Sequence, residues 1–561
     1  MSHKTLRRHP SKILFSKTPV NVLLTGVFLL VCIPAASAQP AKTTVPAQSY
    51  ACDAIVSVLP AEPSNLIPFL ATDSVSADVS RLIFNGLVKY DPDLKLAPDL
   101  AQSWEVLDGG LTIRFHLRHD VHWQDGVPFD AQDVVFTYDK LTDPNVPTPY
   151  GADFDKVLSV QAPDPFTVVV RYREPFSPGL ASWCMGIVPK HLLVKENLRT
   201  TGFARLPIGT GPYRMAKWIS GQKIELEANR EYFEGAPKID RCVFRILPDQ
   251  TTAFLELSAE GVDLTALTPL QYQKLTGGRF FQEKYRKYKV PSFGYVFLGY
   301  NLRHPLFASR QVRRALGIAI DRKEIIQMAL LGCGRPAAGP FLEGSWAADP
   351  SIKAASFEPS GALALLKKEG WVRGKDGRLS KNGQYFTFTV LTTQGNDQRT
   401  MALELIQRRL ADIGVEMKIR TLEWSVFLKE FVDPGRFEAV LLGWRLSVDP
   451  DCYSIFHSTM TGPGKFNFVG YSNSQVDRWL DEGRRQFDPA ARARIYHQIQ
   501  RQIREDEPYS FLYVSDSMPI VHKRFNGVKE SPIGIGYNLN EWWVEPAQAR
   551  YRSACAAKAV S

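Results

Sequence analysis

Cysteine and histidine are scarce in this chain, which has 7 cysteines and 10 histidines among 561 residues. No cysteine belongs to a C-x-x-C pair or to a cluster with histidine. Because zinc is held by these residues at short, characteristic spacings, we expect no metal site of the zinc type. The G-x-S-x-G, H-E-x-x-H, P-loop and G-x-G-x-x-G motifs are also absent. We therefore predict no catalytic residues, no cofactor and no enzymatic activity.

A concentrated basic patch is missing as well. The densest basic pairs, Arg408-Arg409 and Arg484-Arg485, have the spacing of solvated helix faces, so nucleic-acid binding is not expected. No low-complexity tract or short repeat is present, and 44% hydrophobic with 22% charged residues is a globular composition. A chain of this length exceeds what one core usually organises, which indicates several domains or lobes.

The N-terminus has the pattern of a bacterial secretory signal peptide. A mostly apolar run from Val22 to Ile33 is followed by Ala36-Ser37-Ala38, the small-residue site of signal peptidase. The run is shorter than the roughly 20 apolar residues of a membrane anchor. The basic residues before it are Lys4, Arg7, Arg8, Lys12 and Lys17. We expect cleavage before Gln39, which removes these five charges, lowers the formal net charge from +10 to +5, and leaves a soluble periplasmic protein.

Two other export routes fit the sequence less well. Leu29-Leu30-Val31 before Cys32 resembles a lipoprotein box, but valine stands where a small residue is wanted. Arg7-Arg8 lacks the apolar consensus of a twin-arginine signal.

Export to an oxidising compartment permits disulfides, and the six remaining cysteines allow fifteen pairings among which the sequence does not choose. They are Cys52, Cys184, Cys242, Cys333, Cys452 and Cys555.

Strand and helix periodicities alternate along the rest of the chain. Residues 111–117 alternate apolar and polar side chains, as in a half-buried strand, and Phe386, Phe388 and Val390 repeat the pattern. Residues 312–319 carry apolar side chains at helical spacing. Another helix is expected to have Asp321 as its N-cap and Glu324 as the second member of a capping box.

The clearest single unit lies further on. Leu403, Ile406 and Leu410 form a helical stripe, Gly414 ends it, and residues 415–419 alternate as a strand. Helix, glycine stop and strand in succession are typical of an α/β protein.

Two proline positions mark further boundaries. Asp488-Pro489 opens a helix with proline in the first turn. Gly209-Thr210-Gly211-Pro212 looks like a phosphate-binding loop, but proline removes an N–H donor, so we interpret it as a structural turn.

Several segments, in a fixed order, together resemble the family 5 solute-binding proteins of ABC importers, the dipeptide-, oligopeptide- and nickel-binding group. Each is generic alone, but their order and spacing cover nearly the whole mature chain, from about Cys52 to Trp543. The matching segments are Glu62-Pro63-Ser64-Asn65-Leu66-Ile67-Pro68, Leu82-Ile83-Phe84-Asn85-Gly86-Leu87, Pro98-Asp99-Leu100-Ala101-Gln102-Ser103-Trp104, Phe115-His116-Leu117-Arg118, Trp123-Gln124-Asp125-Gly126, Pro207-Ile208-Gly209-Thr210-Gly211-Pro212-Tyr213, and Val312-Arg313-Arg314-Ala315-Leu316 with Ala319-Ile320-Asp321.

The resemblance implies an α/β, two-lobed periplasmic-binding-protein (venus-flytrap) fold with an extra subdomain in the first lobe. Ligand would be buried in a cleft that closes by hinge motion. The chain is expected to cross between lobes near Tyr300-Asn301 and Tyr509-Ser510. The implied boundaries are 1–38 for the signal peptide, 39–94, 207–294 and 509–561 for the first lobe, 95–206 for the extra subdomain and 295–508 for the second lobe.

The same resemblance points to ligand-binding residues. Trp424, within the Glu-Trp-x-x-Phe-Leu segment, and Trp444, after Gly443, match tryptophans that line the cleft in peptide binders of the family. A buried indole removes roughly 150 to 250 Å² of surface and leaves an N–H for a partner. The alternative is that both are ordinary core tryptophans. Tyr150 and Ser64 are placed at the cleft by family position.

Peptide binders of this family also have an aspartate three residues after that tryptophan, which pairs with the ligand ammonium. Here Ser447 stands at that place. Asp449 could take the role if the loop is one residue shorter, with Asp451 following it, or the two acids could cap the next helix. The basic residues that hold a peptide carboxylate in some members are missing before Trp444.

We therefore expect the substrate-binding component of an ABC importer. It would capture small peptides and deliver them to a permease in the inner membrane, as a monomer. A nickel chelate, a sugar or an opine is the alternative ligand for the same architecture. A secreted hydrolase is the alternative of another class, with Asp449 and Asp451 as its one candidate pair.

Overall fold

The structure is a computed structural model that describes residues 53–551. The predicted signal peptide, its cleavage site and three cysteines, Cys32, Cys52 and Cys555, lie outside the described residues. In the described part, no helix is long and apolar enough to cross a membrane. Cys184, Cys242, Cys333 and Cys452 all carry free thiols there.

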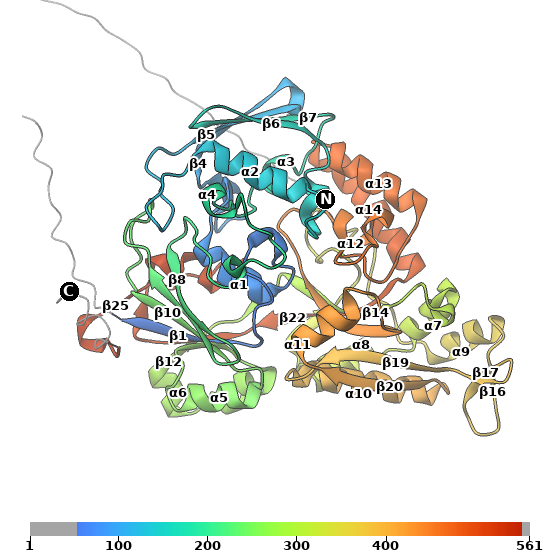
Figure 1. The fold of residues 1–561 in the computed structure, drawn as a ribbon. Coiled ribbons are helices and arrows are strands. Elements are labelled where there is room, and N and C mark those ends of the chain that lie inside the picture. Colours follow the sequence, from blue (N-terminus) through green and yellow to red (C-terminus); the bar gives the residue numbers. More distant parts are fainter. Residues whose placement is uncertain (1–52, 552–561) are drawn as a thin grey trace, which may run out of the picture. The chain divides into compact units, whose positions relative to one another are not determined.

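A mixed seven-stranded sheet forms the first lobe, with blue β1 beside green β10 in Figure 1. β1 is parallel to β10 and β11, while the other neighbours are antiparallel. Helices α1 (Ser74–Ile83), α5 (Gln250–Ser258) and α6 (Arg279–Lys284) belong to this lobe. The strand order is β12 (Tyr285–Lys287), β23 (Pro519–His522), β11 (Leu264–Ala266), β1 (Ala54–Leu59), β10 (Arg241–Ile246), β9 (Lys223–Ala228) and β8 (Tyr213–Ile219).

A separate antiparallel sheet lies within the range predicted for the extra subdomain. Its order is β4 (Ala101–Leu107), β5 (Thr112–Leu117), β7 (Thr167–Tyr172) and β6 (Val157–Asp164). Phe115 and Val168 lie opposite each other on β5 and β7, and both are buried in the same core as the first sheet. The accompanying elements are β2 (Val88–Tyr90), β3 (Leu96–Pro98), α2 (Ala131–Thr142), α3 (Gly179–Ser182) and α4 (Lys190–Leu193).

The second lobe is built on another seven-stranded sheet. β19, β20 and β21 are parallel to one another, and β14 is antiparallel to β21 and β22. β15 (Gly334–Pro336) pairs with β22 at one side. The order of the other strands is β13 (Val290–Pro291), β22 (Tyr509–Ser517), β14 (Gly294–Tyr300), β21 (Ala439–Arg445), β19 (Thr387–Thr393) and β20 (Glu416–Leu422).

Both faces of this second sheet are buried. Val440 and Leu442 of β21 face one core, whereas Ala439 and Leu441 face the other. The first core is covered by α12 (Tyr453–Phe456), α13 (Ser474–Arg485) and α14 (Pro489–Asp506). The second is covered by α7 (Arg310–Ile318), α8 (Arg322–Met328), α9 (Pro359–Lys368) and α10 (Asp397–Asp412). The remaining elements are α11 (Trp424–Val426), β16 (Val372–Arg373), β17 (Leu379–Lys381), β18 (Gln384–Tyr385), β24 (Phe525–Asn526) and β25 (Trp543–Val544).

The chain crosses between the sheets on either side of the second lobe. β12 ends at Lys287 in the first sheet and β13 begins at Val290 in the second. On the return, β22 stays in the second sheet to Ser517, and β23 enters the first sheet at Pro519. The crossings therefore lie near residues 288–289 and 518, instead of at Tyr300-Asn301 and Tyr509-Ser510, because β13 and β14 both pair with β22 in the second sheet.

Most of the local signals are confirmed. The stripe of Leu403, Ile406 and Leu410 is buried on α10, and Gly414 has a φ of +85° directly before β20. The capping-box prediction is half right. Asp321 accepts the N–H of Glu324, but the Glu324 carboxylate pairs with Arg408 and Arg409 across the helix pair.

The turn at Gly209–Pro212 is structural, as expected. A Cβ on Gly209 would lie 1.9 Å from the carbonyl oxygen of Ile83, and one on Gly211 would lie 2.6 Å from backbone atoms of the same region. Glycine is therefore needed for the turn to pack against the end of α1.

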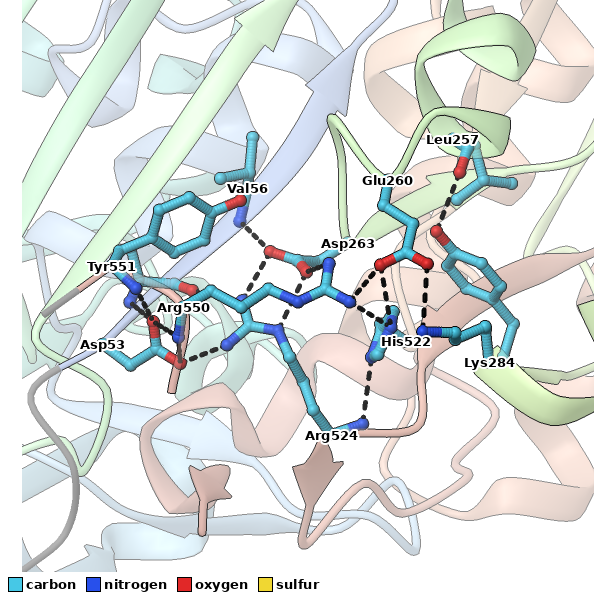
Figure 2. A network of polar contacts seen from close by, with 12 residues as sticks. Asp53, Val56, Leu257, Glu260, Asp263, Lys284, His522, Arg524, Arg550 and Tyr551 are labelled. Atoms are coloured by element: carbon cyan, nitrogen blue, oxygen red, sulfur yellow. Dashed lines mark hydrogen bonds and ion pairs between the residues drawn. The ribbon is translucent and has the colours of Figure 1, made fainter. Parts of the chain in front are cut away.

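A buried ion network joins the two ends of the described chain (Figure 2). Arg524 binds the Asp263 carboxylate through Nε and Nη2, at 3.0 and 2.8 Å, and also pairs with Asp53. Asp53 accepts the N–H of Tyr551, and Arg550 pairs with Glu260. Both carboxylates that Arg524 binds are fully buried, so their charges are satisfied inside the protein.

Candidate ligand-binding site

One edge of the second sheet collects the ends of several strands. β19, β20 and β21 are parallel and therefore end together, and the antiparallel β14 begins at this edge. Crevices outside the carboxyl ends of parallel strands are the usual ligand sites of open α/β sheets. Trp424 and Trp444 both lie at this edge, since Trp424 follows β20 and Trp444 is next to last in β21.

Trp444 is the centre of an aromatic cluster. Its ring is stacked on Phe297, with centroids 6.3 Å apart, and meets Phe466 edge-on at 5.3 Å. Its Nε1 donates to the hydroxyl of Tyr509 at 3.4 Å. The indole N–H is thus partly engaged by the protein, and the ring is only partly buried.

Trp424 has an indole N–H without a partner. Its Nε1 is buried and makes no hydrogen bond among residues 53–551. The ring packs against the cores of both lobes and is stacked with Phe427 at 6.3 Å. Glu423 fixes this position by accepting the N–H of Val426 at 3.0 Å.

Tyr150 reaches the same cluster from the extra subdomain. Its ring meets Phe466 edge-on at 5.6 Å, and Phe466 in turn contacts Trp444. Its hydroxyl donates to the carbonyl of Ala71 at 3.1 Å. Burial raises the pKa of Tyr150, so the hydroxyl stays protonated at neutral pH.

Ser64 belongs to a different small network. Its hydroxyl donates to Asp73 at 2.6 Å, and Asp73 also caps α1 by accepting the N–H of Ser76. The polar group of Ser64 is therefore used to hold the start of α1.

Asp449 and Asp451 are both bound by arginines. Arg492 grips Asp449 with two hydrogen bonds of 2.8 and 2.7 Å, and Arg484 binds Asp451 at 2.8 Å. Asp451 also accepts the N–H of Tyr453 at the start of α12. Ser447 donates its hydroxyl to the carbonyl oxygen of Asp449. This geometry is typical of a loop held by ion pairs and not of an open site for a ligand ammonium group.

Arg484 extends this bracing to the extra subdomain. It donates to Asp153 and to the carbonyl of Ala152, at 2.8 and 2.9 Å. Burial acts to lower the pKa of Arg484, but the carboxylates of Asp451 and Asp153 outweigh it and raise that pKa. Burial likewise raises the pKa of Asp153 to about 6 despite its arginine.

Two contacts between the lobes at this edge have no counterpart in the sequence predictions. Arg445, at the end of β21, binds Asp78 of α1 through two hydrogen bonds of 2.6 and 3.1 Å. Gln250 of α5 bonds with Gln398 of α10 at 3.1 Å. No local pattern signals either pair, because the partners are 367 and 148 positions apart. Within residues 53–551, no three His, Cys, Asp or Glu side chains are grouped to hold a metal ion.

Comparison with known proteins identifies the family. The profile of the bacterial extracellular solute-binding proteins, family 5, matches residues 95–466. The chain belongs to this family. The oligopeptide-binding protein AppA of Bacillus subtilis is 31% identical over 537 residues, which cover 93% of this chain and 97% of AppA. The glutathione-binding protein GsiB of Escherichia coli K12 is 26% identical over 493 residues, covering 85% and 92% of the two chains.

Solved structures of family 5 proteins share the fold. AppA from Bacillus subtilis in complex with a nonapeptide superposes with a TM-score of 0.84 at 30% identity, covering 89% of this chain and all of AppA. NikZ from Campylobacter jejuni in complex with Ni(L-His) gives 0.80 at 28% identity, covering 88% and 99%. The predicted two-lobed α/β fold and the family resemblance are both confirmed.

Proposed function

We propose that this family 5 protein is the substrate-binding component of an ABC importer and captures small peptides between its lobes. The observation that carries the proposal is the pair of tryptophans at the carboxyl edge of the second sheet, where both lobes meet. Their aromatic surfaces suit varied apolar side chains, and Trp424 offers a free N–H to a peptide carbonyl.

Similarity to AppA supports peptide as the ligand, because AppA is named for oligopeptide binding and its structure holds a nonapeptide. We propose that Trp424, Trp444 and Tyr150 form the wall of the site. Ser447 is proposed to face it, while Ser64, Asp449 and Asp451 stabilise the surrounding loops. This assignment replaces the predicted role of Asp449 as the ammonium partner, since both of its oxygens are held by Arg492.

The remaining parts of the proposal concern location and partners. The mature protein would begin at Gln39, act in the periplasm as a monomer without catalysis, and deliver its ligand to a permease in the inner membrane. The first lobe, the extra subdomain and the second lobe would move as the site closes, with hinges at the crossings near residues 288–289 and 518.

Thermal unfolding with and without ligand tests the function. A ligand that binds only the folded state stabilises it by RT ln(1 + [L]/Kd), about 2.7 kcal/mol at a hundredfold excess over Kd. We expect pools of two- to eight-residue peptides to raise the melting temperature, with the bound peptides recovered unchanged by mass spectrometry. A shift with nickel-histidine or an opine alone, or cleavage of the peptides, would contradict the proposal.

A further inference from the structure

A short turn of the extra subdomain enters the second lobe. This turn, η3 (Tyr150–Asp153), follows α2 and precedes β6. The side chain of Ala152 is buried in the core of the second lobe, the one covered by α13 and α14. Phe115 and Val168 of the same subdomain are instead buried in the core of the first lobe. The subdomain is therefore built on one lobe and inserts a single turn into the other.

Arg484, near the end of α13, receives this turn. Its side chain is fully buried, and it donates to the carbonyl of Ala152 at 2.9 Å and to Asp153 at 2.8 Å. Within its own lobe, its Nε donates to Asp451 at 2.8 Å, and its guanidinium lies 3.8 Å from the ring centroid of Tyr453. Because the second lobe alone holds the charge and the plane of Arg484, the donors that face η3 stay oriented when the turn withdraws.

The end of α13 is also completed from the extra subdomain. The last carbonyls of an α-helix have no partner within the helix. Ser177, which lies between β7 and α3, donates its N–H to the carbonyl of Arg484 at 2.6 Å. Its hydroxyl donates to the carbonyl of Gly483 at 3.4 Å. One lobe thus supplies hydrogen bonds that a helix of the other lobe needs.

Two more exposed contacts surround this buried centre. Arg485 pairs with Glu174 of the extra subdomain. The ring of Phe487 lies so close to Gly110, in the turn between β4 and β5, that a Cβ on this glycine would be 2.7 Å from it. We call η3 and Ser177, together with residues 483–487, the latch. Figure 1 shows it where the cyan subdomain meets the orange α13, away from β12.

The latch is connected to the proposed ligand-binding wall through η3 itself. Tyr150 is the first residue of this turn, two positions before Ala152. Its ring meets Phe466, which contacts Trp444. A ligand that packs on these rings and the second-lobe groups that hold Ala152 therefore act on the same short turn.

We propose that the extra subdomain has a function of its own: its turn η3, with Ser177, latches the first lobe to the second and limits how fast a bound ligand leaves. The crossings near residues 288–289 and 518 allow the lobes to turn, but they do not hold the lobes together. The contacts of the latch lie elsewhere and must break before the lobes separate. The part of this inference that concerns release rests on the proposed function.

Ala152→Gln tests the latch without any ligand. The larger side chain should prevent η3 from seating, because a well-packed core does not admit it. Ala152 belongs to the core of the second lobe, so the core of the subdomain stays intact. We expect hydrogen–deuterium exchange to be about 10-fold faster, or more, in peptides that contain Ser177, whose N–H bonds across the boundary. Ala490→Gln is the matched control, because Ala490 is exposed in the first turn of α14.

Protection of β5 and β14 in the same experiment shows whether both lobes remain folded. Unchanged exchange around Ser177 in a folded Ala152→Gln protein overturns the inference. If β5 or β14 loses protection, Phe487→Ala decides by the same measurement, because Phe487 is exposed and its loss does not endanger the fold. The expected increase there is about 2- to 5-fold, and no increase overturns the inference.

Ligand release is measured with a tritium-labelled pool of peptides of two to eight residues. The loaded protein is mixed with an excess of unlabelled pool, and the label that remains bound is followed with time. We expect dissociation from Ala152→Gln to be about 10-fold faster than from wild type and from Ala490→Gln, with a smaller change in association. Faster exchange with unchanged release overturns the inference, since the latch would then not govern the ligand. If wild type binds no peptide, the proposed function fails, whereas the exchange result still decides whether the latch holds the lobes together.

Discussion

The carboxylate of Asp449 is held by two nitrogens of Arg492, and the Arg492 side chain is only 9% exposed. The Asp449 carboxylate opposes the effect of burial and raises the pKa of Arg492. A buried ion pair adds little to stability compared with apolar residues of similar size. Removing one partner, however, leaves the other charge buried without a counter-charge. We therefore expect Asp449 to contribute to the stability of the fold and not to ligand binding.

Asp449→Asn should lower the free energy of unfolding by about 3 kcal/mol, because Arg492 loses its counter-charge. Urea denaturation measures the change. The double variant Asp449→Asn/Arg492→Met should recover much of it. N-acetylation of a bound peptide should change affinity by the same factor in wild type and Asp449→Asn. A factor that shrinks in the variant would restore Asp449 as the ammonium partner.

The residues of the site were predictable only where a local motif carries them. Trp424 and Trp444 stand in recognisable segments, and the structure places both at one sheet edge. The Arg445–Asp78 pair joins residues 367 positions apart.

At the scale of elements, the turn at residues 209–212 packs so closely on α1 that it admits no side chain at its first glycine. The nearest atom to a Cβ on Gly209 would be the backbone oxygen of Ile83, which cannot rotate away. The turn and the end of α1 therefore form one packed unit, held also by the bond from the N–H of Gly211 to Ile83 at 2.7 Å.

Gly209→Ala should lower the free energy of unfolding by about 2 kcal/mol or more, because the backbone must move to admit the methyl group. Gly202→Ala is the matched control, since nothing lies within 4 Å of a Cβ there, and it should change stability by less than about 0.5 kcal/mol. Chemical denaturation of both variants checks the difference. Equal stability of Gly209→Ala and Gly202→Ala would show that the turn can shift to admit a methyl group, and would contradict the prediction.

Helices and strands were predicted well where apolar side chains recur at regular spacing along one face. The helices at 310–318, 397–412 and 489–506 follow their apolar stripes. Glu324 shows the limit of such rules. Its spacing fits a capping box. The Glu324 carboxylate instead binds Arg408 and Arg409 of α10, because charge-assisted hydrogen bonds to two arginines are stronger than one bond to a backbone N–H.

At the scale of the whole molecule, the ends of the described chain depend on each other through the network of Figure 2. His522 lies within it, with Nε2 2.7 Å from Nη2 of Arg550. Burial and the neighbouring Arg550 and Arg524 cations lower the pKa of His522 to about 4. In the folded protein His522 is therefore neutral at any pH well above 4.

This lowered pKa predicts a loss of stability in mild acid. The unfolded chain binds a proton at His522 near pH 6.5, while the folded protein does so only near pH 4. Above about pH 6.5 His522 is neutral in both states and costs no stability. As the pH falls toward 4, the free energy of unfolding decreases by up to about 3 kcal/mol. Between pH 7.5 and pH 5, the free energy of unfolding should fall more for wild type than for His522→Gln. Parallel slopes would contradict the assignment.

The fold as a whole was predictable because the order of motifs identifies the family. The crossing points were not, because β14 and β22 carry the same apolar pattern on either side of a lobe boundary. Which sheet a buried strand joins is decided by its pairing partners, which lie hundreds of residues away.

The first sheet has a consequence for how this protein is made. Its central strand, β1, is the first to emerge during synthesis, yet the sheet needs β23 and the Arg524 side chain that neutralises Asp53 and Asp263. Until residue 524 is available, two acids remain uncompensated and a strand edge stays open. A nascent chain therefore cannot complete this lobe early. The order of synthesis therefore makes completion of the first lobe one of the last steps of folding.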